Sequence, residues 1–272
     1  MVPARFHVAQ ALSPGLMLDL PDSAARHAQV LRLQPGAAIT LFDGTGGQWL
    51  AKVGVMGRKT VSARLLEFQP VERELPTAVT LAVGMPANER MDALVEKATE
   101  LGVARVQPLV CERSVLRLSG ERAQRKVLHW QAIAAGACEQ SGRNRVPHIA
   151  APLPLRTWLA MLPAVPGLTP EPGLPALVPQ PHAPNVSPNA AHRWLLSLAP
   201  DALPLARALA SPGAPATTLL SGPEGGLAPG EIAAAQAAGF WPVSLGPRTL
   251  RADTAPLAAL ACIATLSLDQ SP

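Results

Sequence analysis

The chain has 272 residues, of which 48% are hydrophobic and 15% charged, so it can bury a sizeable core in one or two domains and is not disordered throughout. Aromatic residues make up only 3%, which argues against a nucleic-acid surface built on base stacking, and the net charge of +4 says little about partners. No apolar run is long enough for a membrane span and no signal peptide is recognisable. Three widely spaced cysteines predict a reduced, cytoplasmic protein without a disulfide framework or a metal site.

The first part of the chain, residues 1–72, is predicted to be a small β-rich domain with one helix. Short apolar segments predict the strands, and turn residues between the first two predict a hairpin. Asp22 or Ser23 is expected to cap the helix. The strands are expected at 38–42, 48–55 and 61–68, and the helix at 22–33.

Residues 73–272 show a different pattern, in which strands and helices alternate. This pattern predicts an α/β domain with a mostly parallel sheet. Nine prolines within 163–188 predict an extended surface insertion, because proline cannot continue a helix or a central strand. The strands are expected at 78–83, 103–110, 217–220 and 243–245, with order resuming at 193–198 after the insertion, and the helices at 88–101, 119–140, 229–238 and 254–266.

Basic residues are concentrated between Arg113 and Arg145, where seven lysines and arginines stand against two acidic residues. Such a local excess is what a phosphate-binding surface needs. A solvated helix face followed by a loop would give the same local charge, and the charge alone does not separate these two interpretations.

Two glycine-containing segments, 221–226 and 246–251, each follow a predicted strand and precede a helix. In an open α/β sheet this is where ligands bind. Neither segment has the lysine and hydroxyl of a triphosphate loop or the glycine spacing of a dinucleotide fingerprint. Loops offering mainly backbone N–H and C=O groups suit a nucleoside, such as the adenosine of S-adenosylmethionine, although tight structural turns can look alike.

The residues of these segments resemble the paired C-terminal motifs of the ribosomal RNA small subunit methyltransferase E family. The motifs are Leu219–Gly226 and Ser244–Ala255. Glu96–Val103 and Ala137–Pro147 agree with the same family, as do Arg26-His27, Val30–Leu33 and Gly36 near the N-terminus. The resemblance covers nearly the whole chain except 163–188.

The resemblance implies a PUA-like RNA-binding β-barrel over 1–72 and a SPOUT methyltransferase domain with a deep trefoil knot over 73–272. It also implies a homodimer, since SPOUT active sites are assembled at a subunit interface. The implied reaction is methyl transfer from S-adenosylmethionine to N3 of a specific uridine in 16S rRNA, with the assembled 30S subunit as the expected substrate. No metal and no membrane partner are expected.

The resemblance also suggests site residues. Glu139 is the candidate base that removes the N3 proton, with a structural ion pair to Arg143 or Arg145 as the alternative and solvent as an equal candidate for the base. Arg251 is the candidate that stabilises negative charge on the uracil oxygens. Glu224 is a candidate orienting group or a compensation of the helix dipole. Cofactor binding is expected from Leu198, Leu220, Ser221, Gly222, Pro223, Gly225, Gly226, Leu245, Gly246, Leu250 and Thr254, and RNA binding from Arg26, Arg32, Arg113, Arg143 and Arg145.

The chain departs from the family pattern at a few positions. Ala252-Asp253 stands where the family commonly has Thr-Glu, Pro256 replaces a small residue, and Ala199-Pro200 stands where the family has His-Pro. These departures support the alternative of a ribosome-binding assembly factor with weakened catalysis. A SPOUT enzyme with another RNA target is a second alternative, and a nucleotide-dependent oxidoreductase, which lacks its fingerprint here, is a third.

Overall fold

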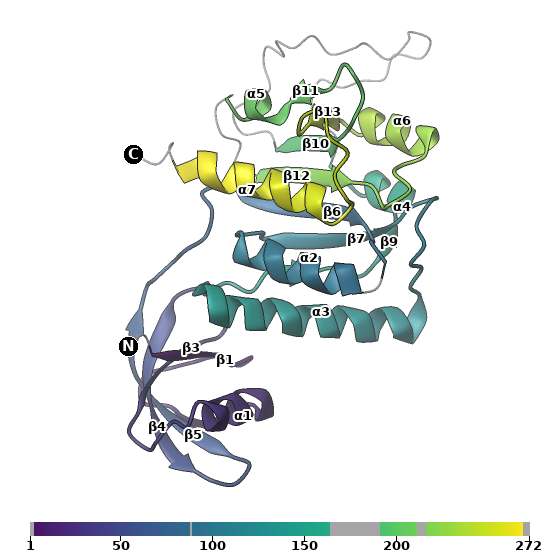
Figure 1. Ribbon diagram of the computed structural model, residues 1–272. Helices are drawn as coiled ribbons and strands as arrows, with labels where there is room; N and C mark the ends of the chain where they lie inside the picture. Colours follow the sequence, from purple (N-terminus) through teal and green to yellow (C-terminus); the bar gives the residue numbers. More distant parts are fainter. Residues whose placement is uncertain (1–2, 88, 164–190, 211–215, 269–272) are drawn as a thin grey trace. The chain divides into compact units, whose positions relative to one another are not determined.

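The computed structural model describes residues 3–87, 89–163, 191–210 and 216–268 (Figure 1). The chain divides into two compact units. Unit 1 consists of Met1–Glu74 together with Ala132–Val146, and unit 2 consists of Leu75–Gln131 together with Pro147–Pro272. Unit 1 therefore contains a segment from the middle of the chain, which a boundary near residue 72 does not include.

Unit 1 contains a five-stranded sheet in the order β1-β3-β4-β5-β2, in which β1 runs parallel to β3 and the other pairs are antiparallel. The hairpin expected from the turn residues is the β3–β4 pair. Apolar side chains such as Phe6, Ile39 and Leu65 fill its core and are at most 1% exposed. The strands are β1 Ala4–His7, β2 Met17–Asp19, β3 Ala38–Phe42, β4 Gln48–Met56 and β5 Val61–Gln69.

The helix of unit 1, α1 (Asp22–Val30), begins and ends differently from the sequence-based expectation. Its N-cap residue is Pro21, and neither Asp22 nor Ser23 provides a side-chain cap. Proline is suited to a helix start because its fixed φ is preorganised and its missing N–H would be unpaired there in any case. The helix stops before Leu33 because Arg32 has a φ of 54°, which is the left-handed conformation that ends a right-handed helix.

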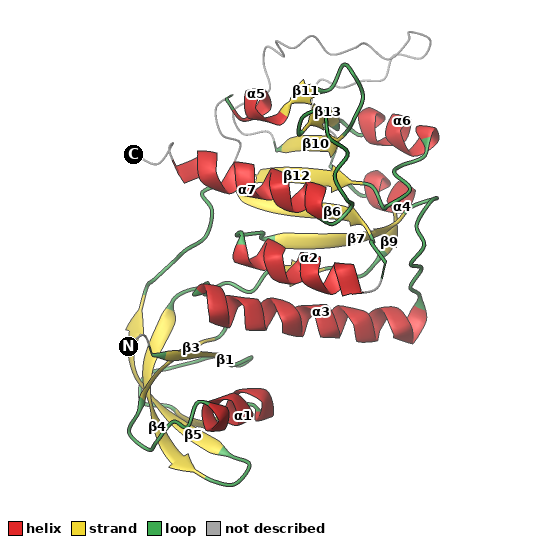
Figure 2. Cartoon of the chain, viewed as in Figure 1, coloured by secondary structure: helices red, strands yellow, loops and turns green. Residues whose placement is uncertain are grey.

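Unit 2 contains a parallel sheet in the order β11-β13-β10-β12-β6-β7-β8, with β9 also paired to β7 (Figure 2). Helices α2 and α7 contact each other, and α7 packs on β6 and β12, whereas α4 contacts α6 and β7. The parallel sheet predicted for this region is thus present. Its strands are β6 Ala78–Gly84, β7 Arg105–Val110, β8 His148–Ile149, β9 Leu153–Pro154, β10 His192–Leu196, β11 Leu203–Pro204, β12 Ala216–Ser221 and β13 Trp241–Ser244.

The four helices expected in this region are observed close to their predicted ranges, two short helices (α4 and α5) were not predicted, and the long helix α3 supplies residues to both units. The helices are α2 Glu89–Glu100, α3 Gly120–Ser141, α4 Leu155–Ala160, α5 Leu205–Leu209, α6 Pro229–Ala237 and α7 Thr254–Leu268. Among the residues that the structure describes, no helix has the length and apolar character needed to cross a membrane. The proline-rich insertion expected at 163–188 lies, beyond residue 163, outside the described residues.

Candidate functional site

The glycine-containing segments of unit 2 follow neighbouring strands. In the sheet, β10 lies between β13 and β12, and all three run parallel, so their carboxyl ends meet at one edge. The segment after β12 begins at Gly222, the segment after β13 begins at Leu245, and Leu198 follows β10. The structure therefore brings the sequence-predicted cofactor residues from three separate stretches to the same edge of the sheet.

The backbone of these segments is accessible to a ligand at two glycines. Gly226 has a φ of 68° and Gly246 a φ of 104°, and at both positions a Cβ atom would have no heavy atom within 4 Å. Left-handed φ values favour glycine, and the open space lets another molecule approach the main chain. Leu198, whose exposed fraction is 61%, and the half-buried Leu250 offer apolar surface in the same set of segments, whereas Leu220 is buried in the core.

The segment between β12 and α6, Gly222–Leu227, is fixed to the ends of neighbouring strands. The carboxylate of Glu224 accepts a hydrogen bond from the backbone N–H of Ala87 (3.0 Å) and forms an ion pair with Arg90. Arg113 donates from Nη1 to the carbonyl oxygen of Gly225 (3.1 Å), so this candidate RNA-binding arginine also contacts the loop. Of the two interpretations of Glu224, these contacts favour an orienting role.

In the segment between β13 and α7, one buried carboxylate oxygen accepts no hydrogen bond from the described residues. The backbone N–H groups of Thr254 and Ala255 bond to the carbonyl oxygen of Arg251, and the next residue, Pro256, has no N–H. Asp253 precedes α7, where an aspartate normally caps the helix by accepting from these groups. Its Oδ1 atom is buried and has no hydrogen-bond partner among the described residues. The exposed Arg251 lies just before it.

Glu139, the candidate base, belongs to unit 1, whereas Arg251 belongs to unit 2. The Oε1 atom of Glu139 accepts a hydrogen bond from the backbone N–H of His7 at 2.8 Å. Burial raises the pKa of this carboxyl group, although the hydrogen bond from His7 and the charges of His27 and Arg5 oppose the rise. A partly buried carboxyl group with a raised pKa suits proton transfer, and it also fastens the end of α3 to β1.

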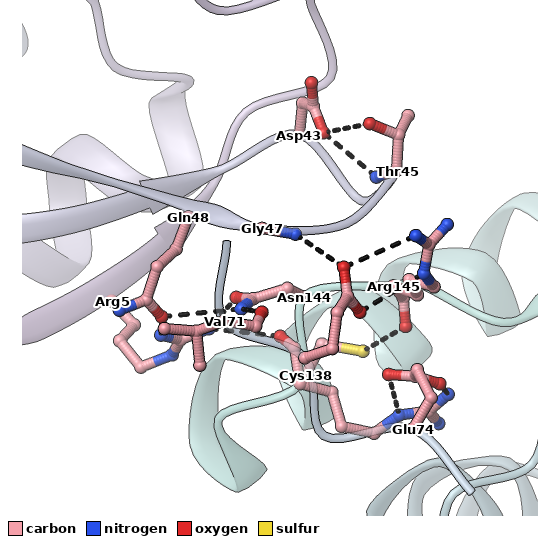
Figure 3. Close-up of polar contacts among 12 residues, drawn as sticks. Arg5, Asp43, Thr45, Gly47, Gln48, Val71, Glu74, Cys138, Asn144 and Arg145 are labelled. Carbon is pink, nitrogen blue, oxygen red and sulfur yellow. Dashed lines mark hydrogen bonds and ion pairs between the residues drawn. The ribbon is translucent and has the colours of Figure 1, made fainter. Parts of the chain in front are cut away.

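The basic residues that follow α3 are largely paired inside unit 1. Arg143 has an exposed side-chain fraction of 3% and forms an ion pair with Glu74, and the more exposed Arg145 pairs with Glu72 (3.2 Å). The local excess of positive charge in the sequence is thus reduced by two glutamates from the segment before β6. Between these arginines, the buried Asn144 accepts from Arg5 and donates from Nδ2 to the carbonyl oxygen of Val71 (Figure 3).

The remaining candidate RNA-binding residues, Arg26 and Arg32, are exposed. Arg26 donates from Nε to the carbonyl oxygen of Asp22 on its own helix. Both side chains are available to phosphate groups on the surface of unit 1.

One polar residue of this region was missed by sequence reasoning. Glu231, at the start of α6, has an exposed fraction of 4%, and its carboxylate accepts hydrogen bonds from the backbone N–H groups of Ala228 and Glu112. Glu231 stands three residues after Ala228, which is the glutamate position of a capping box, but Ala228 lacks the hydroxyl of the Ser or Thr that completes the sequence signal. Its contact with Glu112 has no such signal.

Comparisons with known proteins place the chain among RNA methyltransferases. The model of the RNA methyltransferase domain family matches residues 73–264, and that of the RNA methyltransferase PUA domain matches residues 20–66. Ribosomal RNA small subunit methyltransferase E of Synechocystis is 38% identical over 88% of this chain and 69% of that protein. The protein of the same name from Mycobacterium bovis is 31% identical over 98% of this chain and 93% of its own length.

Two solved structures are similar over almost the whole chain. The ribosomal RNA small subunit methyltransferase E of Neisseria gonorrhoeae, bound to S-adenosyl methionine, has a TM-score of 0.81 and 34% identity, covering 97% of this chain and 98% of that one. A methyltransferase of Legionella pneumophila, in complex with the same cofactor, has a TM-score of 0.80 and 30% identity, covering 97% of each chain.

Proposed function

Because this chain belongs to the ribosomal RNA small subunit methyltransferase E family, we propose that it transfers a methyl group from S-adenosylmethionine to N3 of a specific uridine in 16S rRNA. The observation that carries the proposal is the convergence of the two glycine-containing segments with Leu198 at the β13-β10-β12 edge. Similar structures that hold the same cofactor support this assignment.

The residues at this edge fit S-adenosylmethionine. Gly226 and Gly246 leave open space beside the main chain, so backbone groups can read the edge of an adenine ring. Leu198 and Leu250 provide apolar surface for its faces. We assign the cofactor to these residues together with Ser221, Gly222, Pro223, Gly225, Leu245 and Thr254, whereas Leu220, which has no exposed surface, supports them from the core. When bound, S-adenosylmethionine supplies the electrophilic methyl group.

The steric part of this assignment has a direct test. In Gly226→Ala, the new methyl group occupies the space expected for the ligand, and we expect the Kd for S-adenosylmethionine to rise at least tenfold by calorimetry. Gly120→Ala is the matched control, because Gly120 also has a left-handed φ (54°) and open space around its Cβ position, but is the first residue of α3. An equal loss of affinity in both variants would show that backbone strain, not the site, is responsible.

The chain's own residues must prepare the uridine for methylation. N3 of uracil carries an imide proton and becomes nucleophilic only when that proton leaves. Glu139, whose pKa is raised by burial, takes this proton in the proposal, and Arg251 stabilises the negative charge that develops on the uracil oxygens. The base must also be turned out of its stack to reach the site.

Glu139→Gln separates catalysis from structure. The amide oxygen of a glutamine can still accept the hydrogen bond from His7, so unit 1 should keep its stability, while the side chain can no longer accept a proton. We expect kcat to fall by about 10²-fold or more, in line with the typical contribution of a general base. Unchanged kcat would assign Glu139 a structural role only.

We extend the proposal to RNA binding and assembly. Residues 1–72 act as a PUA-like barrel that contacts RNA through Arg26 and Arg32, and residues 73–272 act as a knotted SPOUT domain that works as a homodimer on the assembled 30S subunit. Arg113 and the exposed Arg145 contribute further phosphate contacts. We assign Arg143 a supporting role beneath the RNA-binding surface, because its side chain is buried against Glu74.

The activity itself is tested by incubating the protein with radiolabelled S-adenosylmethionine and either unmodified 30S subunits or naked 16S rRNA. We expect label transfer and a single enzyme-dependent stop of reverse transcription at a uridine, because a methyl group on N3 blocks base pairing. A stop at another base would identify a different RNA target. Binding to 30S subunits without label transfer would favour an assembly factor and overturn the catalytic proposal.

A further inference from the structure

Glu231 of α6 is a buried carboxylate that makes no ion pair with any basic residue of the described parts of the chain. Its Oε2 atom accepts from the backbone N–H of Ala228 at 2.9 Å, and its Oε1 atom accepts from that of Glu112 at 2.8 Å. The first bond caps α6. The second reaches a residue 119 positions earlier in the chain, in the segment that follows β7.

Burying a negative charge is costly unless the charged group is hydrogen-bonded, and here the two backbone N–H groups supply those hydrogen bonds. A carboxylate has two acceptor oxygens and no donor, whereas a glutamine amide has a single acceptor oxygen and would place an N–H group against one of the two donors. The N-terminal end of α6 also stabilises a negative charge. The charge of Glu231 also acts on a neighbouring thiol. Burial and the carboxylate of Glu231 together raise the pKa of Cys111 to about 12.

The two hydrogen bonds join segments that follow neighbouring strands. Ala228 directly follows the Gly222–Leu227 segment after β12, and Glu112 lies in the segment that follows β7. In the sheet, β6 separates β12 from β7, and the three strands run parallel. Glu231 thus connects the proposed cofactor loop to a strand end two positions away in the sheet.

The middle of the same loop is fastened independently. Glu224 accepts from the backbone of Ala87, which follows β6, and Arg113, the residue after Glu112, donates to the carbonyl oxygen of Gly225. A Cβ atom on Gly84, at the end of β6, would lie 2.5 Å from Pro223 Cδ, which shows how closely the loop approaches this strand. The loop is therefore held at its middle by these contacts and at its end by Glu231.

We propose that Glu231 is a positioning residue that holds the Gly222–Leu227 loop, through Ala228 and Glu112, in the conformation that receives the cofactor. The proposal rests on the proposed function, because it assumes that this loop binds S-adenosylmethionine. Glu231 acts through the backbone of the loop and needs no contact with the reacting atoms.

The test compares Glu231→Gln and Glu231→Ala with the unaltered protein. Gln keeps one acceptor and Ala keeps none, so we expect the Kd and the KM for S-adenosylmethionine to rise about tenfold in the first and further in the second. The KM for 30S subunits should stay within twofold in Glu231→Gln. This split between the two substrates, and the partial rescue by Gln relative to Ala, are effects that general destabilisation would not produce.

Gln107→Met provides the control for stability. Gln107, on β7, has an exposed fraction of 2% and donates two hydrogen bonds, to the carbonyl oxygens of Pro108 and Ala151. Its replacement removes two buried hydrogen bonds from the same unit without touching the loop. We expect it to lower the Tm while leaving the Kd for S-adenosylmethionine within twofold of the unaltered value.

The outcomes separate this inference from the proposed function. If the unaltered protein binds the cofactor and Glu231→Gln binds it equally well despite a lower Tm, Glu231 is only a helix cap and the inference is overturned. An equal loss of affinity in Gln107→Met overturns it as well. If the unaltered protein fails to bind S-adenosylmethionine, the proposed function falls, and the inference falls with it.

Discussion

At the scale of single residues, the carboxylate of Asp253 occupies the place of a helix cap without acting as one. The backbone N–H of Ala255 is already bonded to Arg251, and Pro256 has none, so Oδ1 of Asp253 is left without a donor among the described residues. An aspartate that caps a helix typically contributes about 1 kcal/mol to stability. Here that contribution is missing, although the residue type and position predict it.

We therefore expect Asp253→Ala to change the free energy of unfolding by no more than about 0.5 kcal/mol, because its buried Oδ1 atom accepts no hydrogen bond from the described residues. Urea denaturation measures the change. Ser114→Ala serves as the comparison, since the buried Ser114 hydroxyl accepts from the backbone N–H of Cys111 and its loss should cost about 1–3 kcal/mol. A loss of similar size in Asp253→Ala would mean that the carboxylate does cap α7.

The ion pair between the buried Arg143 and the partly buried Glu74 allows a second prediction at this scale. Removing one partner leaves the other charge without compensation, so Arg143→Met should destabilise the protein by about 3–5 kcal/mol. The double variant with Glu74→Met should recover most of this loss, because both charges are then gone. A double-mutant cycle by chemical denaturation measures the coupling. Additive losses would show that Arg143 stabilises unit 1 independently of Glu74.

At the scale of elements, α2 and α3 are joined by one carboxylate. Oδ1 of Asp92 accepts from the indole Nε1 of Trp130, and Oδ2 lies 2.8 Å from Nε2 of His129. Burial acts to raise the pKa of Asp92, but the hydrogen bonds from His129 and Trp130 and the charge of Lys126 outweigh it, so the pKa is lowered. The ionised carboxylate of Asp92 stabilises the folded protein fully above the ordinary aspartate pKa of about 3.9. This stabilisation is lost as the pH falls through the lowered pKa that Asp92 has in the folded protein.

Accordingly, Asp92→Asn should lower the Tm at pH 7, and the difference from the unaltered protein should shrink as the pH falls below about 4. Thermal denaturation followed by circular dichroism across this range measures it. Glu96→Gln, which breaks an exposed ion pair with Lys97 on the same helix, should have little effect at any pH. A pH-independent difference for Asp92→Asn would assign the loss to packing instead of charge.

The elements themselves follow from local sequence patterns to very different degrees. Ala38–Phe42 is observed with the bounds that its apolar run and following turn predict, and the expected helix at 88–101 is observed as Glu89–Glu100. Strands of two residues, such as β8 and β9, were missed because they are too short to show periodicity. In the candidate site, the loops could be predicted from their strand–glycine–helix order. The surroundings of Glu139 could not, because its partner His7 lies 132 positions away.

At the scale of the whole molecule, unit 1 depends on a segment from the middle of the chain. Besides Glu139 and Arg143, the segment 132–146 contributes the carbonyl oxygen of Gly142 to Arg73 and the N–H of Val146 to Gly44. We expect the isolated segment 1–74 to show little cooperative unfolding by circular dichroism. A fragment that adds 132–146 through a short glycine–serine linker should unfold cooperatively. Equally cooperative unfolding of both fragments would show that the β-sheet of unit 1 is self-sufficient.

The insertion of 132–146 into unit 1 also sets the order in which the newly made chain can complete its parts. Synthesis proceeds from the N-terminus at about 5–20 residues per second, so the partner of His7, 132 positions later, follows it by roughly 7–26 s. During this interval the first strands lack Arg143, the ion-pair partner of Glu74, and Asn144, which accepts from Nη2 of Arg5. The N-terminal strands can therefore reach their final contacts only after residue 146 has been translated, and a chaperone bound to them would act in that interval.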